Sequence, residues 1–309
     1  MSDQRMPTHH GVETSVEGSY SNKTMQLLYQ RKSCRRFQQK KIPPELLEQI
    51  LGVGVHAPSG GNLQNVSIVK VEDQERRQRL MGALGNQRFI GEAPVNLVFC
   101  LDLRRNKRWA ELEVAPFTAN CTLGFFLMGV QETGIVAQNI CTAADSVGLG
   151  SCYVGNVLWA TKAVSAILEL PKYVFPTVLL SLGYSSDNRS QTKKHKLGTI
   201  LHSETYRDLN DEDLLAACKE KWTEEGYRRI ELTEGRLEVL YSTCEKVHGR
   251  EFAEKSVARA RMQGYISPVQ RYFGLHYRAD WVLMSGGNSG FMKVIEESGF
   301  DCFRDYLPE

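Results

Sequence analysis

Apolar residues recur at helical spacing in several stretches of the chain. The first predicted helix covers residues 23–30. A second follows Pro43 and Pro44, which suit the first turn of a helix. Its apolar face is formed by Leu46, Leu47, Ile50 and Leu51. The two helices flank a strongly basic segment.

Two further helices are predicted in the middle of the chain. A long one ends at Gly148 and Gly150, because glycine commonly terminates helices. Its inward face is expected to consist of Val136, Ile140, Ala143 and Val147. Thr161 is a suitable capping residue for the next helix, and Pro171 follows its end. The inward residues expected there are Val164, Ile167 and Leu168.

Three short apolar runs have the length and composition of strands. They cover residues 66–71, 95–101 and 174–182. Because helices and strands alternate along the chain, the pattern indicates an α/β or α+β domain. We find no internal repeat and no low-complexity tract.

The chain divides into three regions. Residues 1–20 are polar and lack the apolar run of a signal peptide, so we expect a disordered lead. Residues 21–206 contain the alternating elements and are predicted to form one core domain. Residues 207–309 are more highly charged and are predicted to form a mostly helical extension, although residues 250–285 show no clean period.

Composition narrows the functional classes. The chain has 309 residues, of which 42% are hydrophobic, which is enough for a full core. Lys and Arg total 38 against 36 Asp and Glu, a formal net charge of +2, so the global electrostatic case for a nucleic-acid partner is weak. No apolar run approaches the ~18 residues that a membrane span needs.

The 8 cysteines indicate a reducing, cytoplasmic setting. None forms a C-x-x-C pair and no histidine lies at zinc-ligand spacing from them, so no metal site is expected. Several, such as Cys100, lie in apolar runs, where free cysteine is commonly buried as a small hydrophobe.

Cations concentrate in two segments far apart in the chain, Arg31–Phe37 and Lys194–Leu197. Arg31, Ser33 and Arg35 alternate, so an extended backbone would project them to the same side. The planar guanidinium suits phosphate oxygens, and each charge-assisted hydrogen bond contributes about 1.5–3 kcal/mol. The two segments together predict a phosphate-binding clamp, whereas the first alone is equally consistent with a solvated basic helix end.

A polar turn, Ala57–Gln64, lies between the basic segments. Its glycines let the backbone approach a ligand. The hydroxyl and amide groups of Ser59, Asn62 and Gln64 can meet a ring edge that both donates and accepts hydrogen bonds. The alternative is an ordinary loop that caps a helix.

Four segments in this order resemble the FMN-binding nitroreductase family: Arg31–Phe37, Ala57–Gln64, Gly85–Ile90 and residues 137–156. The last one resembles the branch of oxygen-insensitive NADPH nitroreductases and NADPH:flavin oxidoreductases nearly residue for residue. The resemblance extends over residues 23–206. It implies an α+β fold with a mostly antiparallel central sheet flanked by helices. It also implies bound FMN and an intertwined homodimer that builds each FMN site from both chains.

The resemblance also implies which residues bind FMN. The basic segments would hold its phosphate, the turn and Gln87 would face the ring system and ribityl chain, and the backbone after the glycine-rich turn would meet the N5/O4 edge. The implied residues are Arg31, Lys32, Ser33, Arg35, Ser59, Asn62, Gln64, Gln87, Tyr153, Val154, Gly155, Asn156, Lys194 and Lys196. No side chain is expected to act as a catalytic nucleophile. Gln87 as a surface amide and Tyr153 as core packing remain open alternatives.

The chain departs from the family pattern at several of these positions. Ser151, Cys152 and Asn156 stand where the branch more often has small residues or glycine. Lys196 stands where arginine is common, and Gly198 replaces a proline. Lysine is a point charge, so the bidentate geometry of arginine would be lost at Lys196.

We therefore expect an FMN-dependent oxidoreductase that passes two electrons from NADPH or NADH to a nitroaromatic, quinone or flavin acceptor. Donor and acceptor would share one flavin face and so alternate, which gives ping-pong kinetics. The alternative is an FMN-binding redox module reduced by a protein partner, without NAD(P)H turnover. An unusual insert at about 223–288 motivates this alternative, since it could cover the flavin. If the insert instead recognises NADPH, Arg259 and Arg261 are candidates by charge alone.

A homodimer is also expected from the residues themselves. The predicted helix around residues 122–148 is apolar on more than one side, more than the core of one subunit requires. The residues concerned are Phe125, Phe126, Leu127, Met128 and Val130.

Overall fold

The computed structural model describes residues 20–222, 230–280 and 287–304. Contacts divide the chain into two compact units. The sheet unit comprises Lys23–Gln191 and Asn288–Glu309, and the helical unit comprises Met1–Asn22 and Thr192–Gly287. The predicted lead at residues 1–20 lies outside the described residues except for Tyr20. The core boundary predicted at residue 206 stays a prediction.

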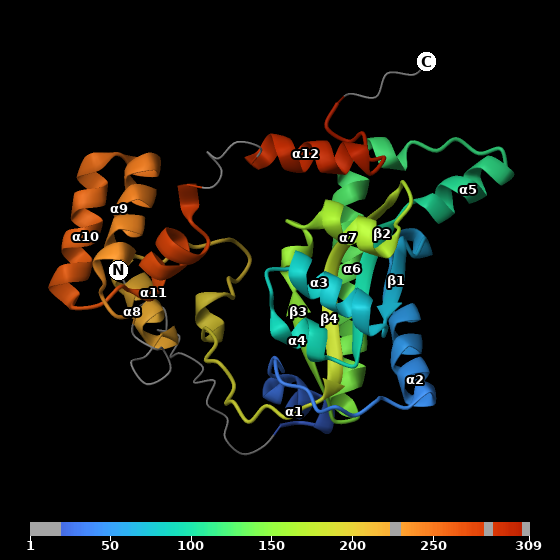
Figure 1. Cartoon of the computed structure of the whole chain (residues 1–309), viewed down its shortest axis with the longest axis horizontal. Helices are drawn as coiled ribbons and strands as arrows, with labels where there is room; N and C mark the ends of the chain where they lie inside the picture. Colours follow the sequence, from blue (N-terminus) through green and yellow to red (C-terminus); the bar gives the residue numbers. More distant parts are fainter. Residues whose placement is uncertain (1–19, 223–229, 281–286, 305–309) are drawn as a thin grey trace, which may run out of the picture. The chain divides into compact units, whose positions relative to one another are not determined.

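The sheet unit is built on a four-stranded antiparallel sheet in the order β1-β2-β4-β3, an α+β arrangement as predicted (Figure 1). The strands are β1 (Val66–Val71), β2 (Val95–Asp102), β3 (Leu149–Val154) and β4 (Val174–Tyr184). The apolar runs predicted β1, β2 and β4. The strand β3 was not predicted, because glycine and serine at its start weaken the local signal, whereas pairing with β4 along its whole length stabilises it.

Helices cover both faces of this sheet. The helices of the sheet unit are α1 (Lys23–Gln30), α2 (Pro44–Val55), α3 (Gln74–Ala83), α4 (Arg88–Glu92), α5 (Arg104–Leu112), α6 (Leu123–Ser146), α7 (Thr161–Leu168) and α12 (Gly287–Glu297). Every residue of β2 is buried. Its alternate side chains enter two cores, one shared with α2 and α6 and the other with α3, α4 and α7. The long helix α6 is thus one wall of the main core.

The helical unit has its own small core. Its helices are α8 (Asp211–Lys221), α9 (Glu234–His248), α10 (Arg250–Gln263), α11 (Pro268–Gln270) and the π-helix η5 (Arg271–His276). The buried core residues are Leu237, Leu240, Ala260 and Ile266. The helix α10 falls where the sequence has no clean period, and Gly264 in the left-handed conformation ends it.

Short 3₁₀ turns complete the described chain. They are η1 (Gly60–Asn62), η2 (Ala119–Cys121), η3 (Gly155–Val157) and η4 (Leu197–Thr199). Two of them, η1 and η3, carry residues predicted to bind the cofactor. Of the helices in the described ranges, none is long and apolar enough to cross a membrane.

The buried face of α6 differs from the predicted one. Ile140 is fully buried, but Val147 lies beyond the helix end and is 43% exposed. The buried residues in the second half of α6 are Ala137, Ile140, Cys141 and Ala144. Val136 and Ala143 are half-buried and pack against the same core, so the predicted face was right for three residues and wrong for Val147, because the helix ends at Ser146.

The predicted capping role of Thr161 was also wrong. The helix α7 begins at Thr161, and Ala160 occupies the capping position. The Thr161 hydroxyl donates to the carbonyls of Val157 and Leu158 at 3.2 and 3.0 Å. It therefore bonds backward into the preceding turn and leaves the first N–H groups of α7 without a side-chain cap.

Gly129 tests the close contact between α6 and β2. A Cβ at this position would lie 2.2 Å from Cδ1 of the fully buried Leu101. We expect Gly129→Ala to lower the free energy of unfolding by about 1–3 kcal/mol, because the core must shift to accept it. The control is Gly82→Ala in α3, where a Cβ meets nothing within 4 Å and alanine favours the helix. Equal stability of the two variants in a denaturant titration would contradict this packing.

Candidate functional site

The first basic segment runs in extended form beside β3, which is an edge strand of the sheet. Ser33 forms an isolated parallel bridge with Ser151 of β3, and Phe37 forms an antiparallel bridge with Ser185. The Cys34 N–H donates to the Ser151 carbonyl at 2.7 Å. Because Cys34 and Phe37 are both buried, they fix the backbone, and the two arginines between them are exposed.

Arg31 lies between α6 and β3. Its Nε is 3.8 Å from Oδ2 of Asp145, and its guanidinium carbon is 5.6 Å from the centre of the Tyr153 ring. Burial raises the pKa of Asp145 to about 6, against the opposing attraction of Arg31. Within the described part of the chain, the buried Nε and Nη2 of Arg31 have no hydrogen-bond partner. Buried donors of this kind are normally satisfied, so an anion placed here would complete them.

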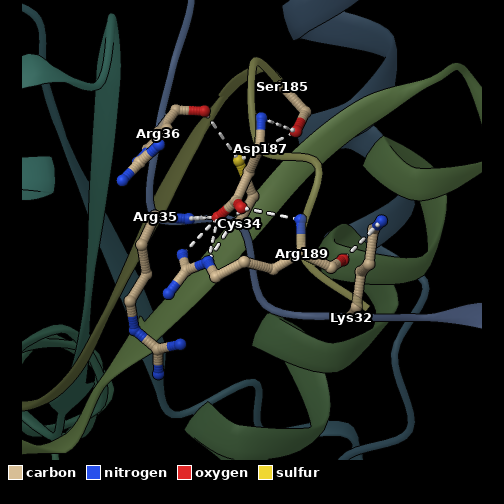
Figure 2. A network of polar contacts seen from close by, with 7 residues as sticks. All are labelled: Lys32, Cys34, Arg35, Arg36, Ser185, Asp187 and Arg189. Carbon is tan, nitrogen blue, oxygen red and sulfur yellow. Dashed lines mark hydrogen bonds and ion pairs between the residues drawn. The ribbon is translucent and has the colours of Figure 1, made fainter. Parts of the chain in front are cut away.

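A buried carboxylate ties the basic segment to the loop after β4 (Figure 2). Asp187 accepts hydrogen bonds from the Arg35 backbone N–H at 3.0 Å and from the Arg189 backbone N–H at 3.2 Å. The Arg189 side chain donates to it from Nε at 2.8 Å and also from Nη2. Chiefly these side-chain hydrogen bonds hold the pKa of Asp187 well below its usual range, against the effect of burial. Lys32 extends the network, since its Nζ donates to the Arg189 carbonyl at 2.9 Å.

Positive charge converges at this end of β3. Burial raises the pKa of the Cys152 thiol, and the charges of Arg35, Arg31 and Arg189 all act to lower it. Arg31 pairs with Asp145, and Asp187 holds both the Arg189 side chain and the Arg35 backbone N–H. Since the cations of this cluster outnumber its carboxylates, the cluster is suited to bind an anion.

The end of β3 brings two more predicted segments together. Tyr153 is half-buried and its hydroxyl donates to Gln138 Oε1 at 3.3 Å, whereas Val154 is 2% exposed. Gly155 and Asn156 follow as exposed residues of η3. A Cβ on Gly85 would lie 3.5 Å from Asn156 Nδ2, so the two loops are neighbours.

Gln87 belongs to the same pair of loops. It precedes α4 as its capping residue and donates from Nε2 to the Leu84 carbonyl at 3.1 Å. The amide is half-buried and has a local partner. Among the described residues, no hydrogen bond reaches the side-chain oxygen of Gln87. Its role toward a ligand stays a prediction.

The polar turn is organised by a second buried carboxylate, Glu132 of α6, which is 5% exposed. Its Oε1 accepts from the Ser59 hydroxyl at 3.1 Å and from the Gly60 N–H at 2.8 Å. Its Oε2 accepts from the Asn65 N–H at 3.3 Å. The Ser59 oxygen in turn accepts the Gln64 N–H at 2.8 Å. The turn is therefore held in one conformation by a helix more than sixty residues later in the chain.

The turn and the basic segment line different cavities of the sheet unit. A cavity of about 270 Å³ is lined by Ser59, Asn62, Gln64 and Glu132, with Trp109 on α5. A second cavity, of about 190 Å³, is lined by residues of the basic segment. Its lining includes Arg31, Lys32, Ser33, Asp145 and Asp187. One chain thus does not bring all the predicted cofactor-binding residues into a single cavity.

The second predicted basic segment belongs to the helical unit. Lys196 forms an ion pair with Glu220 at 2.8 Å. The Lys221 Nζ lies 2.9 Å from His195 Nε2, and burial and the Lys221 charge lower the pKa of His195. The predicted contribution of Lys194 and Lys196 to the phosphate clamp stays a prediction.

Four polar residues at these sites were not predicted: Glu132, Asp145, Asp187 and Arg189. A carboxylate inside an apolar helix, as at Glu132, is a usable sequence signal, because an acid is rarely buried without partners. The Asp-x-Arg spacing at 187–189 directly after a predicted strand is another. No group of three potential metal ligands occurs among the residues that the structure describes.

Comparison with known proteins gives consistent matches. Residues 28–184 match the model of the Nitroreductase family. The chain is 32% identical over 244 residues to an FMN reductase (NAD(P)H) of Bacillus subtilis, a match that covers 76% of this chain and 97% of that protein. Among solved structures, nitroreductase A from Vibrio parahaemolyticus has 34% identity and a TM-score of 0.61, covering 65% of this chain and 83% of that one. The NADPH:FMN oxidoreductase from Vibrio harveyi complexed with NAD⁺ has 31% identity and a TM-score of 0.60, covering 64% and 84%.

Asp187 gives a pH-dependent test of the network. Because its folded-state pKa is lowered, its ionised form stabilises the fold above the unfolded pKa of about 3.9, and this contribution is lost as the pH falls below about 4. We expect Asp187→Asn to lower the free energy of unfolding by about 1–2 kcal/mol at pH 7, and the deficit to shrink at low pH. Urea titrations over this pH range measure it. Glu72→Gln at an exposed ion pair is the control, and a pH-independent deficit at Asp187 would argue against the ionised network.

Proposed function

The chain belongs to the nitroreductase family, and on that premise we propose that it is an FMN-dependent oxidoreductase that uses NADPH or NADH. Both the family match and the relatives agree with the resemblance seen in the sequence. The fold is the α+β fold of the nitroreductases, as the similarity to the Vibrio parahaemolyticus enzyme indicates. The name of the Bacillus subtilis relative pairs FMN with NAD(P)H.

One observation carries the cofactor assignment. The buried Nη2 of Arg31 has no hydrogen-bond partner among the described residues, and its Nε has only the Asp145 carboxylate at 3.8 Å, beyond hydrogen-bond distance. A phosphate monoester carries about −1.5 to −2 charge and three strong acceptor oxygens. The residues present therefore fit the phosphate of FMN, and Lys32, Ser33 and Arg35 are proposed to share it.

Bound FMN would supply the redox chemistry, accepting two electrons as hydride from a nicotinamide and passing them to the acceptor. The protein's own groups bind and orient. Tyr153, Val154, Gly155 and Asn156 are proposed to line the ring, with Gln87 on the adjacent loop. Since donor and acceptor would occupy the same exposed face in turn, the kinetics are expected to be ping-pong. The acceptor class we propose is a flavin, a quinone or a nitroaromatic compound.

The names of the relatives disfavour the alternative of a redox module reduced only by a protein partner. They are named as NAD(P)H-using reductases. We keep as a proposal that Arg259 and Arg261 of the insert recognise NADPH. In the structure, Arg261 forms an ion pair with Glu234 at 3.1 Å. A cytoplasmic setting is proposed on chemical grounds, since all 8 cysteines are free.

We further propose a homodimer in which each FMN site is built from both chains. In a single chain the polar turn and the basic segment line different cavities, which supports a site completed by a second copy. The helix α6 packs on the sheet and still exposes large apolar side chains elsewhere. These are Leu123, Leu127, Met128 and Ile135, at 41%, 52%, 42% and 41% exposure. Residues Ser59, Asn62 and Gln64 would then face the FMN of the partner chain.

Reduction by NADPH tests the function directly. We expect the purified protein to be yellow and to bind FMN in a titration. Anaerobic addition of NADPH or NADH should bleach the flavin absorbance, and an acceptor such as a quinone should restore it. Free FMN mixed with the same nicotinamide is the control for the uncatalysed reaction. A protein that binds FMN but is not bleached by either nicotinamide would revive the partner-reduced alternative.

The exposed face of α6 tests the dimer. We expect light scattering to give about twice the 34.9 kDa of one chain for the parent protein. Leu127→Glu should shift the mass toward one chain and weaken FMN binding, because it places a charge in the proposed interface. The control Met262→Glu alters a residue of the helical unit that is 81% exposed and should change neither property. A 34.9 kDa parent particle with bound FMN would refute the proposal.

A further inference from the structure

The loop after β4 contains an arginine that neither the sequence patterns nor the family resemblance assigned. We propose that Arg189, held in place by Asp187, is an additional ligand for the phosphate of FMN. This inference rests on the proposed function, because it names one more residue of the same site. It differs from the assignment of Lys194 and Lys196, which lie farther along the chain in the helical unit.

The position of Arg189 is fixed relative to the basic segment by contacts within the sheet unit (Figure 2). Its side chain donates to Asp187, which also accepts the Arg35 backbone N–H. Its carbonyl accepts a hydrogen bond from Lys32 Nζ at 2.9 Å. Two predicted phosphate ligands are therefore bonded to Arg189 or to the carboxylate that holds it.

The ion pair with Asp187 leaves Arg189 able to bind an anion. A guanidinium has five N–H donors, and Asp187 engages only Nε and Nη2 of the side chain. The side chain is 54% exposed, while that of Asp187 is 4% exposed, so the carboxylate lies beneath and the cation reaches the surface. Because the pairing restricts the guanidinium before any ligand arrives, less conformational entropy is lost when a phosphate binds.

Hydrogen bonds to one carboxylate, Asp187, place Arg189 beside Arg35. The charges of Arg189, Arg35 and Arg31 all act on the thiol of Cys152, which is buried at the end of β3. Asp187 neutralises only part of this charge. Asp145 lies 3.8 Å from Arg31 and offsets a further part, so the three arginines still outnumber the two carboxylates, and a phosphate would supply the missing negative charge.

Arg189 would also compensate for one position at which this chain departs from the family pattern. Lys196 stands where the family often has arginine, and lysine provides a point charge without a planar fork. Lys196 is moreover ion-paired with Glu220. Arg189 supplies a planar guanidinium from the loop directly after β4, so the chain retains a bidentate donor near the basic segment.

The test compares two ligands that differ only in the phosphate. Apoprotein is titrated with FMN and with riboflavin, and binding is followed by flavin fluorescence. We expect Arg189→Ala to weaken FMN binding by about tenfold and to leave riboflavin binding unchanged, which is the lower end for a charge-assisted hydrogen bond because the side chain is half exposed. Arg189→Gln, whose amide can still donate to Asp187, should weaken FMN binding to a similar extent.

Arg76→Ala is the matched control, since Arg76 forms an exposed ion pair with Glu169 at 3.2 Å outside this cluster. Equal loss of FMN and riboflavin affinity in both Arg189 variants would overturn the inference and leave Arg189 as a structural link. Unchanged FMN affinity would overturn it as well. If the parent protein binds FMN and is reduced by NADPH in either case, the proposed function stands without it. A parent that binds no FMN would instead remove the proposed function.

Discussion

The burial of carboxylates that must be satisfied by distant partners determines the candidate site. An ionised carboxylate taken out of water is costly unless hydrogen bonds and charges replace the solvent. Asp187 finds these partners in its own loop and in the basic segment, 152 residues earlier in the chain. The backbone of the basic segment and the Arg189 side chain are consequently fixed by one group, and the cations around it are left facing outward.

Glu132 applies the same principle to the polar turn. The Ser59 hydroxyl and the Gly60 N–H of that turn, and the N–H of Asn65 directly after it, donate to its oxygens. The turn includes Gly61, Asn62 and Gln64 at positive φ values of 57°, 55° and 51°, a backbone conformation that residues other than glycine adopt uncommonly. The hydrogen bonds to Glu132 offset this strain, so a helix of the main core holds a surface loop in shape. The basic segment and the polar turn are thus each positioned by a buried acid.

Local sequence patterns predicted the elements whose signal is local. The strands β1, β2 and β4 have continuous apolar runs, and α1 and α2 have clear helical spacing. The strand β3 was missed because its pairing with β4 is a long-range interaction that no window of residues contains. The family resemblance supplied the candidate ligands, and these remain predictions. Asp187 and Arg189 were missed because their importance lies in a contact between segments far apart in the chain. Lys196 was predicted to bind phosphate from its local pattern, which does not show its ion pair with Glu220.

The wide sequence separation of these contacts affects how the chain matures. The basic segment is synthesised early, but Ser151 and Asp187 follow only after most of the sheet unit has been made. At a ribosomal rate of about 5–20 residues per second, a separation of 152 residues corresponds to roughly 8–30 s during which the Arg35 backbone lacks its Asp187 partner. Contacts between residues so far apart in sequence form slowly, because the entropy cost of closing the loop between them comes first. The proposed phosphate site can therefore form only after β3 and the loop after β4 have been made, and FMN can bind there only after that.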